Sequence, residues 1–455
     1  MNIIIVGCGK IGKCILSRLI KENHNVTVID KNQTVVNEIA DNYDVISICG
    51  NCTAYDTLIE AKANKADIFI ATTNLDEINL LSSFIAKTMG AKYTVARVRD
   101  EDHNSKNFEF VREKLGISMT INPELYTAKH IYNLLQFPSA TKVETFTSRC
   151  FEIAELTVKE NSPLINVPLA ELRKKYPYKF LISAILRDGE AIIPDGSVVL
   201  KPKDKIGLLS SFPETHKLLK LMDFDKKPIK NVLIVGAGRI TNYLAELLLE
   251  GKNSVTVIEK NESRALEFSE AFDGKLTVVK GDGLNNGLLL EHGVNSVDAF
   301  LSLTGKDEQN FLTSYYAKSK NAGKVITKIN NEAIIGVSEN LGLETLVSTQ
   351  SIIADVIASY VRALQSSEGS KIETLYTLMN GMIEASEFTV TPDFALTNIP
   401  LKNLKLKQNT IVAGIIRKGT SIIPGGDDVI LPDDKVIIIS KGQKVIDLFD
   451  CIKQK

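Results

Sequence analysis

Residues 2–12 read NIIIVGCGKIG, a short apolar run that leads directly into a Gly-x-Gly-x-x-Gly motif. An acid, Asp30, ends the next apolar run, 23 residues after Gly7. A strand, a glycine turn, a helix and an acid at the end of the following strand form the context that a dinucleotide site requires. The opening of the chain therefore predicts a nucleotide site; the alternative is a glycine turn with a solvated Asp.

The same pattern returns in the second half of the chain. Residues 231–241 read NVLIVGAGRIT, and Glu259 again follows Gly236 by 23 residues. Three more pairs of segments match: 26–32 (VTVIDKN) with 255–261 (VTVIEKN), 66–79 with 297–310, and 185–210 with 415–440. Repetition over such lengths indicates a duplicated chain, each half with a larger front lobe and a smaller back lobe.

The front lobe alternates short apolar strands with helices. In the first copy we expect strands at 3–6, 26–29, 45–48, 68–71 and 93–98, and helices at 11–20, 34–42 and 77–89. This alternation predicts β-α-β units around a parallel sheet. The back lobe contains a strand, a short helix and a hairpin that turns at Asp188-Gly189.

The predicted fold class is therefore α/β, with two tandem repeats. Each repeat is a Rossmann-like parallel-sheet nucleotide-binding lobe followed by a small α+β lobe. The predicted parts are 1–140 (first front lobe with a crossover helix), 141–222 (first back lobe), 223–229 (linker), 230–364 (second front lobe with a crossover helix) and 365–455 (second back lobe).

The glycines and the acid of the first copy each have a physical role. Gly7 permits the tight turn, Gly9 lets the backbone approach a pyrophosphate at the helix N-terminus, and Gly12 allows the helix to pack closely on the strand. Asp30 can accept hydrogen bonds from a free ribose, and it would repel a 2′-phosphate. The first site thus favours NAD(H) over NADP(H).

The second copy departs at one position. Gly236, Gly238 and Glu259 remain, but Thr241 replaces the third glycine, so we expect its helix to stand off the strand or shift. A working second nucleotide site is the favoured interpretation, and a lobe that kept its fold and lost its ligand is the alternative.

Other candidates follow later strands of the predicted sheet, at the edge where ligands of such sheets bind. Asn51 follows the third strand, Thr73 and Asn74 follow the fourth, and Arg97 lies on the fifth. Arg97, whose match is Lys328, could reach a phosphate, or it could equally pair with Asp76 or Glu77.

Composition limits the class of protein. The chain has 455 residues, 44% of them hydrophobic, which is enough for several cores. Lys and Arg number 54 against 55 Asp and Glu, a net charge of −1 that argues against nucleic-acid binding. We find no bilayer-length apolar run and no signal-peptide pattern at the N-terminus. We therefore expect a cytoplasmic location.

Catalytic and metal motifs are weak or missing. No nucleophile elbow, zinc-protease or P-loop motif is present, so we expect no catalytic residues, no bound metal and no enzyme activity. Cys49 and Cys52 form a C-x-x-C pair that could act as a redox pair or as half a metal site. The second copy has Lys280 and Gly283 there, so the repeat works without sulfur.

Together, these glycine loops, acids and duplicated back-lobe motifs resemble the Trk-type potassium-uptake peripheral proteins (the TrkA family), which carry paired RCK (KTN) domains. The resemblance implies a cytoplasmic regulator that assembles into a ring, a homotetramer, on a TrkH-like membrane potassium-translocating subunit. It implies NAD(H) as ligand, with ATP or ADP as alternatives. The binding residues that it implies are Gly7, Cys8, Gly9, Lys10, Ile11, Gly12, Asp30, Asn51, Thr73, Asn74 and Arg97, then Gly236, Ala237, Gly238, Arg239, Ile240 and Glu259.

The resemblance also implies that the helices after Asn122 and near Gln350 pair neighbouring front lobes. The leading hypothesis is a nucleotide-sensing regulatory subunit that gates potassium uptake at the inner face of the membrane. The runner-up is an NAD-dependent oxidoreductase with a duplicated cofactor domain, and the third is a redox or metal sensor that uses the two cysteines.

Overall fold

The structure, a computed structural model, describes residues 1–99, 106–146, 150–224, 227–331, 334, 341–365, 370–392, 394–443 and 445–453. The first front lobe is built on a six-stranded parallel sheet. In sheet order its strands are β3 (Ile46–Cys49), β2 (Asn25–Asp30), β1 (Asn2–Val6), β4 (Ile68–Ala71), β5 (Tyr93–Arg97) and β6 (Met119–Ile121). Its helices are α1 (Lys10–Lys21), α2 (Gln33–Asn42), α3 (Tyr55–Glu60), α4 (Asp76–Met89) and α5 (Lys106–Lys114). The predicted alternation is confirmed, although α3, α5 and β6 were not foreseen.

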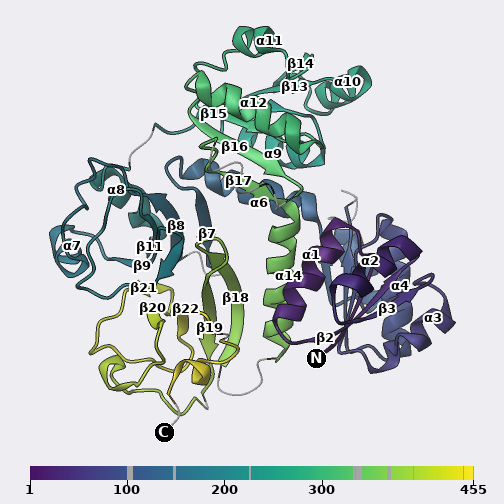
Figure 1. Ribbon diagram of the computed structural model, residues 1–455, viewed down its shortest axis with the longest axis horizontal. Coiled ribbons are helices and arrows are strands. Elements are labelled where there is room, and N and C mark those ends of the chain that lie inside the picture. The colour runs from purple at the N-terminus through teal and green to yellow at the C-terminus, as the bar shows by residue number, and fades with distance from the viewer. Residues whose placement is uncertain are drawn as a thin grey trace.

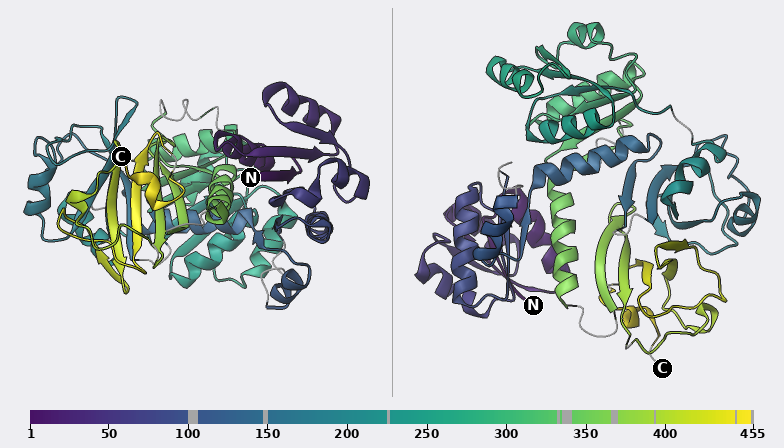
Figure 2. Two further views of the ribbon diagram at one scale, coloured as in Figure 1. Left: turned by 90° about the horizontal axis from the view of Figure 1, so that it is seen from below. Right: turned by 180° about the vertical axis from the view of Figure 1, so that it is seen from behind.

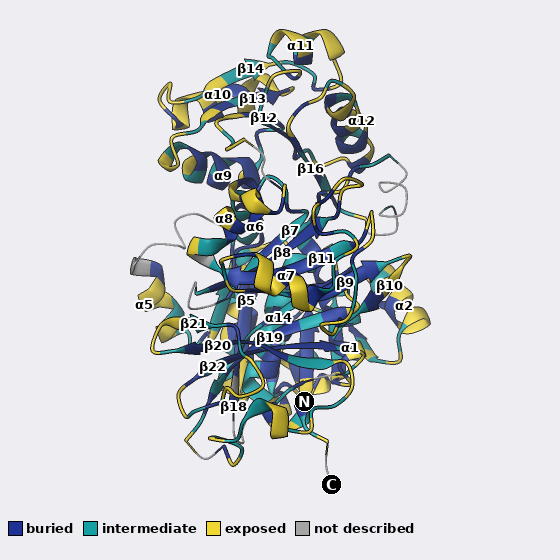
Figure 3. Ribbon diagram, turned by 90° about the vertical axis from the view of Figure 1, so that its left-hand side faces the viewer, coloured by how far each residue is buried: buried dark blue, intermediate teal, exposed yellow. Residues whose placement is uncertain are grey.

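The second front lobe repeats this topology. Its sheet runs β14 (Thr277–Lys280), β13 (Ser254–Glu259), β12 (Asn231–Val235), β15 (Ala299–Ser302), β16 (Lys324–Ile329) and β17 (Leu346–Ser348). Its helices are α9 (Arg239–Glu250), α10 (Glu262–Ala271), α11 (Asn286–Glu291) and α12 (Asp307–Ser319). Figure 3 shows the sheet strands mostly buried and the outer helices α10 and α11 largely exposed, as expected for a sheet covered on both faces.

The two back lobes are five-stranded antiparallel sheets with the same strand order. The first contains β10 (Glu190–Ile192), β9 (Phe180–Arg187), β11 (Lys205–Ser211), β8 (Phe151–Thr157) and β7 (Lys142–Thr145), with α7 (Leu169–Lys175) and α8 (Phe212–Leu221). The second contains β21 (Thr420–Ile422), β20 (Thr410–Arg417), β22 (Lys435–Lys441), β19 (Ile383–Val390) and β18 (Ser370–Leu378). The predicted Asp-Gly hairpin is confirmed, since Asp188 and Gly189 both have positive φ, 51° and 82°.

The repeated Arg-x-Gly motif of the back lobes has a structural role. Arg187 donates two hydrogen bonds to the carboxylate of Asp204, at 2.6 and 2.8 Å, and a third to the carbonyl of Val199. Arg417 and Asp434 repeat the arrangement in the second back lobe. Each pair ties the hairpin to the turn before the last strand, so this motif belongs to the scaffold of the lobe.

The crossover helices exchange places between the halves. Helix α6 (Pro123–Gln136), which leaves the first front lobe, packs on α9 of the second. Helix α14 (Thr349–Gln365), which leaves the second, packs on α1 of the first. Figures 1 and 2 show α14 beside α1 and α6 beneath the second front lobe. The two front lobes of one chain are thus paired through these helices.

The exchange is visible in the hydrophobic cores. Ile353, Ile357 and Val361 of α14 share a core with the strands and α1 of the first front lobe. Ile131 and Leu134 of α6 lie in the core that contains α9. The back lobes share a third core, in which β8 and β9 of one lobe contact β19 and β20 of the other. The predicted linker at 223–229 includes residues 225–226, which lie outside the described residues.

Candidate functional site

The three glycines of the first loop have the geometry that their roles require. Gly7 has φ = +81°, and a Cβ there would lie 2.8 Å from the backbone nitrogen of Thr73. A Cβ at Gly12 would lie 2.2 Å from the carbonyl oxygen of Gly7, so only glycine allows α1 to pack this closely. A Cβ at Gly9 would meet nothing within 4 Å. Gly9 therefore leaves an open space at the N-terminus of α1, where an anion can approach the backbone.

The acid after β2 is held by the loop that it faces. Asp30 accepts hydrogen bonds from the backbone N–H of Cys8 at 2.8 Å and of Asn32 at 2.9 Å. The amide of Cys8 is thus engaged by Asp30, whereas α1 begins without a side-chain cap on its first-turn amides. The backbone N–H groups that remain available to an anion are therefore those of Lys10, Ile11 and Gly12 at the start of α1.

The second loop has the same frame. Glu259 accepts hydrogen bonds from the backbone N–H of Ala237 and of Asn261, both at 2.8 Å. Gly236 has φ = +104°, and a Cβ at Gly238 would again meet nothing within 4 Å. Both copies therefore present an open glycine beside a fixed carboxylate.

The second copy accommodates a side chain at the third position of its glycine loop. Helix α9 begins at Arg239, the position that matches the first residue of α1, and Thr241 is fully buried in its first turn. The Thr241 hydroxyl donates to the carbonyl of Gly236 at 2.5 Å. In the first copy Thr72 donates the equivalent bond to Gly7 at 2.8 Å, and its match in the second copy is Leu303. The hydroxyl that bonds this carbonyl therefore comes from the β-strand side in the first copy and from the helix side in the second. Because a Cβ at Gly12 would lie 2.2 Å from the Gly7 oxygen, the second loop must differ locally from the first to admit Thr241.

The loop after β4 is organised by a buried amide that the sequence analysis missed. Asn79 of α4 accepts a hydrogen bond from the Thr73 hydroxyl at 2.7 Å and donates to the carbonyl of Arg97 at 2.9 Å. Asn310 of α12 does the same with Thr304 and Lys328. The signal was present, because both matched segments, 66–79 and 297–310, end on this Asn.

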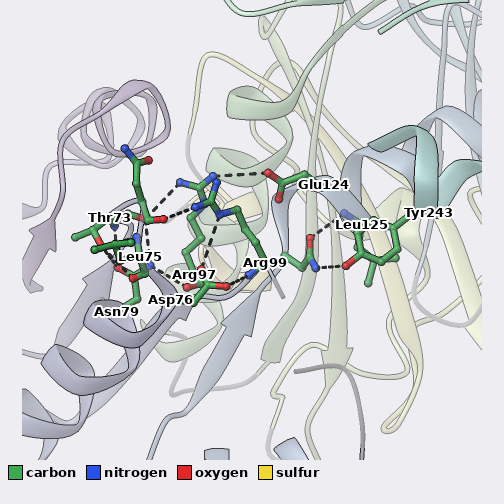
Figure 4. A network of polar contacts seen from close by, with 11 residues as sticks. Thr73, Leu75, Asp76, Asn79, Arg97, Arg99, Glu124, Leu125 and Tyr243 are labelled. Atoms are coloured by element: carbon green, nitrogen blue, oxygen red, sulfur yellow. Dashed lines mark hydrogen bonds and ion pairs between the residues drawn. The ribbon is translucent and has the colours of Figure 1, made fainter. Parts of the chain in front are cut away.

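Arg97 lies at the carboxyl edge of the sheet, with its partners in Figure 4. It is 8% exposed, it donates to the carbonyl of Thr73 at 3.4 Å, and its guanidinium lies 3.8 Å from Glu124 at the start of α6. Its Nε has no hydrogen-bond partner among the residues that the structure describes. The acid 3.8 Å from it is thus Glu124, which the sequence analysis had not considered, while Asp76 lies 3.8 Å from Arg99.

The basic groups of the two front lobes influence one another. Burial lowers the pKa of Arg97, and the positive charge of Arg239 in the second glycine loop adds to this effect. Burial lowers the pKa of Lys328 as well, and there the added charge is Lys10 of the first loop. The glycine loop of the other copy is thus a minor influence on each basic residue, because the nearby acids Glu124, for Arg97, and Asp307, for Lys328, act more strongly on the pKa.

The remaining predicted residues lie around this edge. Asn51 is exposed and its Oδ1 accepts from the backbone and hydroxyl of Thr53, so it shapes the turn before α3. The carbonyl of Asn74 accepts from Arg99. Cys49 is exposed and Cys52 is buried, both as free thiols, and burial raises the pKa of Cys52. A raised pKa disfavours the thiolate that redox chemistry needs.

This arrangement can bind an anionic nucleotide. Each copy brings together an open helix start, a fixed carboxylate and a basic residue, buried in the first copy and half-buried in the second, at one edge of a parallel sheet. The residues present fit a dinucleotide, because the Cβ-free space at Gly9 and the unpartnered Nε of Arg97 lie on the ligand edge. In the described part of the chain, no helix combines the length and apolar character needed to cross a bilayer.

Comparison with known proteins gives consistent matches over the whole chain. The TrkA-N domain model matches residues 3–123 and 232–349, and the TrkA-C domain model matches residues 153–223 and 385–451. The Trk system potassium uptake protein TrkA homolog of Archaeoglobus fulgidus is 30% identical over 98% of this chain and 98% of its own. TrkA of Vibrio alginolyticus is 28% identical over 98% and 97%.

Solved structures share the fold at low identity. A structure described as the GsuK channel bound to NAD has a TM-score of 0.64 and 17% identity, covering 97% of this chain and 77% of that one. A crystal structure of GsuK bound to ADP has a TM-score of 0.51 and 14% identity, covering 79% and 69%. These likenesses show a common architecture of paired front and back lobes.

Proposed function

This chain belongs to the TrkA family, with its N and C domains present twice, and from that premise we propose that it is a nucleotide-sensing regulatory subunit of a membrane potassium uptake system. The observation that carries the proposal is the frame found in both copies. In each, a glycine with open space at its Cβ position begins a helix beside a fixed carboxylate. Such a frame suits an anionic ligand at the start of the helix.

The ligand of the first site is NAD(H), with ATP or ADP as the alternatives. Asp30 at the end of β2 suits an unphosphorylated ribose and opposes the charge of a 2′-phosphate. The backbone at Gly9 to Ile11 receives the pyrophosphate, and Arg97 supplies a positive charge. Of the structural neighbours, GsuK is described as bound to NAD in one structure and to ADP in another, which supports this ligand class.

The second site binds a ligand of the same class. Gly238 leaves the same open space as Gly9, and α9 begins at Arg239, the residue that matches the start of α1. Glu259 is 8% exposed, so a ribose has less access to this carboxylate than to the half-buried Asp30. We therefore place the tighter dinucleotide site in the first copy.

Nucleotide binding can change how the two front lobes pair. Arg97 and Arg239 repel one another weakly, as do Lys328 and Lys10, and each pair spans the two lobes. A phosphate that contacted both basic groups would attract each of them, so we expect the ligand to favour the arrangement of the lobes that brings the two charges close. A ligand that prefers one arrangement shifts the population toward it, typically by about 1–3 kcal/mol per site.

Assembly into a homotetrameric ring would multiply this effect. Leu81 and Phe84 are exposed on the outer face of α4, and Leu312 and Tyr315 are exposed at the matching places of α12. Repeated apolar pairs on both front lobes suit contacts between copies of the chain. The ring would then act from the cytoplasm on a TrkH-like potassium-translocating subunit.

The test uses cells that depend on this system for growth at low potassium. The full chain, co-expressed with a candidate pore subunit, should restore growth, and either protein alone should not. The variant Gly9→Ala/Gly238→Ala should lose the restoration, because each methyl fills the open space without touching the protein. The control Gly425→Ala lies in a back-lobe turn, where the added methyl would lie an ordinary 3.7 Å from the Asp428 carboxylate, and it leaves both loops intact.

The same purified proteins separate this proposal from its rival. Calorimetry should give stoichiometric NADH binding by the wild type, and the double variant should bind at least tenfold more weakly. Steady NADH oxidation with hydroxy-acid or aldehyde partners would favour an oxidoreductase. Growth that is restored equally well by the double variant would contradict nucleotide sensing.

A further inference from the structure

Arg362, on α14, is the largest fully buried side chain of the described residues. Its guanidinium donates two hydrogen bonds to the carboxylate of Glu22, at 2.8 and 3.0 Å. It donates two more to the carboxylate of Glu384, also at 2.8 and 3.0 Å. One arginine therefore holds two acids in bidentate geometry, the strongest form of such a contact.

The three residues of this clamp belong to three different parts of the chain. Glu22 caps the C-terminal end of α1, whose other end is the glycine loop of the first nucleotide site. Arg362 lies on the crossover helix that the second front lobe contributes, and Glu384 lies on β19 of the second back lobe. Helix α1 has 12 residues, so about 18 Å separates the ligand loop from the clamp.

The clamp joins these parts firmly. Glu22 is 5% and Arg362 is 1% exposed at the side chain. Burial acts to raise the pKa of Glu22, but the His24 ring 3.8 Å away and the hydrogen bonds from Arg362 outweigh it and hold the pKa at about 2. Removing one partner of a buried pair leaves an uncompensated charge, so separating α1 from β19 at this point is costly.

The duplicate of the clamp has lost two of its three members. Gly251 occupies the place of Glu22, and the exposed Gln136 occupies the place of Arg362. Only the acid on the strand remains: Glu152 pairs with Ser210 in the ladder as Glu384 pairs with Ser440. For Glu152 no ion pair is found among the residues that the structure describes.

We propose that the Glu22–Arg362–Glu384 clamp transmits the state of the first glycine loop to the second back lobe, and so couples the nucleotide site of one half to the back lobe of the other. This inference rests on the proposed function. The coupling is one-sided, because the other half has no arginine with which to complete it. The nucleotide at the first site thus has a route to the back lobes that the nucleotide at the second site does not have.

The test compares two leucine substitutions at matched positions of the back lobes. Glu384→Leu cuts the clamp but leaves Arg362 paired with Glu22, so no buried charge is left uncompensated. Glu152→Leu makes the same change in the other back lobe. Both are made in the full chain that carries Gly238→Ala, so that only the first site is read with NADH. Glu384→Gln serves as the milder variant should the leucine reduce folding.

Hydrogen exchange with and without NADH gives the readout. In the parent chain NADH should change the exchange of amides in both α1 and β19. Glu384→Leu should keep the change in α1 and reduce that in β19 at least fivefold, and Glu152→Leu should keep both. Because coupling is reciprocal, Glu384→Leu should also alter the NADH affinity at least fivefold, in contrast to less than twofold for Glu152→Leu.

The possible results distinguish a failure of the clamp inference from a failure of the proposed function. NADH binding with an unchanged response of β19 in Glu384→Leu overturns the clamp and leaves the proposed function standing. A parent chain that binds NADH without any response in β19 does the same. A parent chain that does not bind NADH overturns the proposed ligand, and the clamp inference falls with it.

Discussion

The carboxylate of Asp30 accepts a hydrogen bond from the backbone N–H of Cys8, 2.8 Å away in the middle of the glycine loop. Glu259 and Ala237 form the same bond in the second copy. The longer Glu side chain therefore reaches the same amide as the shorter Asp. In both copies the acid is oriented by its own loop, and its outer lone pairs remain available for a ribose.

Asp30→Ala should weaken NADH binding by about 1–3 kcal/mol, the loss expected for a hydrogen bond to a charged group. The effect combines a lost ribose acceptor with a less ordered loop, and titration calorimetry measures it. Asp195→Ala, in an exposed back-lobe turn, is the control. Equal affinity of Asp30→Ala and the wild type would place the ribose elsewhere.

The exchange of Thr72 and Gly12 for Leu303 and Thr241 predicts coupling within the first loop. Gly12→Ala places a methyl 2.2 Å from the Gly7 carbonyl, so it should destabilise the first front lobe by about 1–3 kcal/mol. Adding Thr72→Leu frees that carbonyl from its hydroxyl partner. The double variant should therefore lose at least about 0.5 kcal/mol less unfolding free energy than the sum of the losses in the two single variants. Urea unfolding of the four proteins measures this difference, and strict additivity would contradict it.

Glu152→Gln should stabilise the chain at alkaline pH. Burial raises the pKa of Glu152 to about 7, against hydrogen bonds from Thr215 and Thr145. The folded protein then binds this proton more tightly than the unfolded chain, so the carboxyl costs stability increasingly as pH rises from about 4.5 to 7. The Gln variant should gain about 1–3 kcal/mol at pH 8 and almost nothing at pH 4.5.

Denaturant unfolding at the two pH values checks this prediction. Glu160→Gln, an exposed acid shortly after the same strand, should show no such difference. A gain of equal size at both pH values would mean that the effect comes from packing and not from the proton.

Leu312→Asp on α12 should reduce the assembly below the tetramer. The side chain is 62% exposed, so the substitution has little effect on folding, but a charge in an apolar contact between copies opposes association. Light scattering coupled to size exclusion measures the mass. Leu266→Asp on α10, also 59% exposed, is the control and should leave the mass unchanged. An unaltered mass in both variants would place the ring contact elsewhere.

The features that the sequence predicted are those fixed by near neighbours along the chain. The strand, glycine turn, helix and acid at residues 2–30 depend on local sterics, and the duplication provided an independent second reading of each. The Asn of the repeated VTVIDKN and VTVIEKN segments proves to be a helix cap: Asn32 and Asn261 accept the backbone N–H of Thr34 and Arg264.

The features that escaped prediction depend on contacts between distant segments. The pairing of Arg97 with Glu124 requires α6 to start at the sheet edge, and the clamp joins residues 340 positions apart. Charged residues on an amphipathic helix normally face solvent, so Arg362 carried no sign of burial. Comparing the two copies position by position would have marked Arg362, because its match is a Gln.

The exchange of α6 and α14 has a consequence for the origin of the chain. A single half, folded alone, would lack a cover for the apolar face of its own first helix, so it could be stable only as a homodimer that traded these helices between molecules. Fusion of two such halves made the partnership permanent and released each from having to be self-complementary. Specialised, unequal contacts could then evolve on one side alone, which no symmetric pair of identical subunits can achieve.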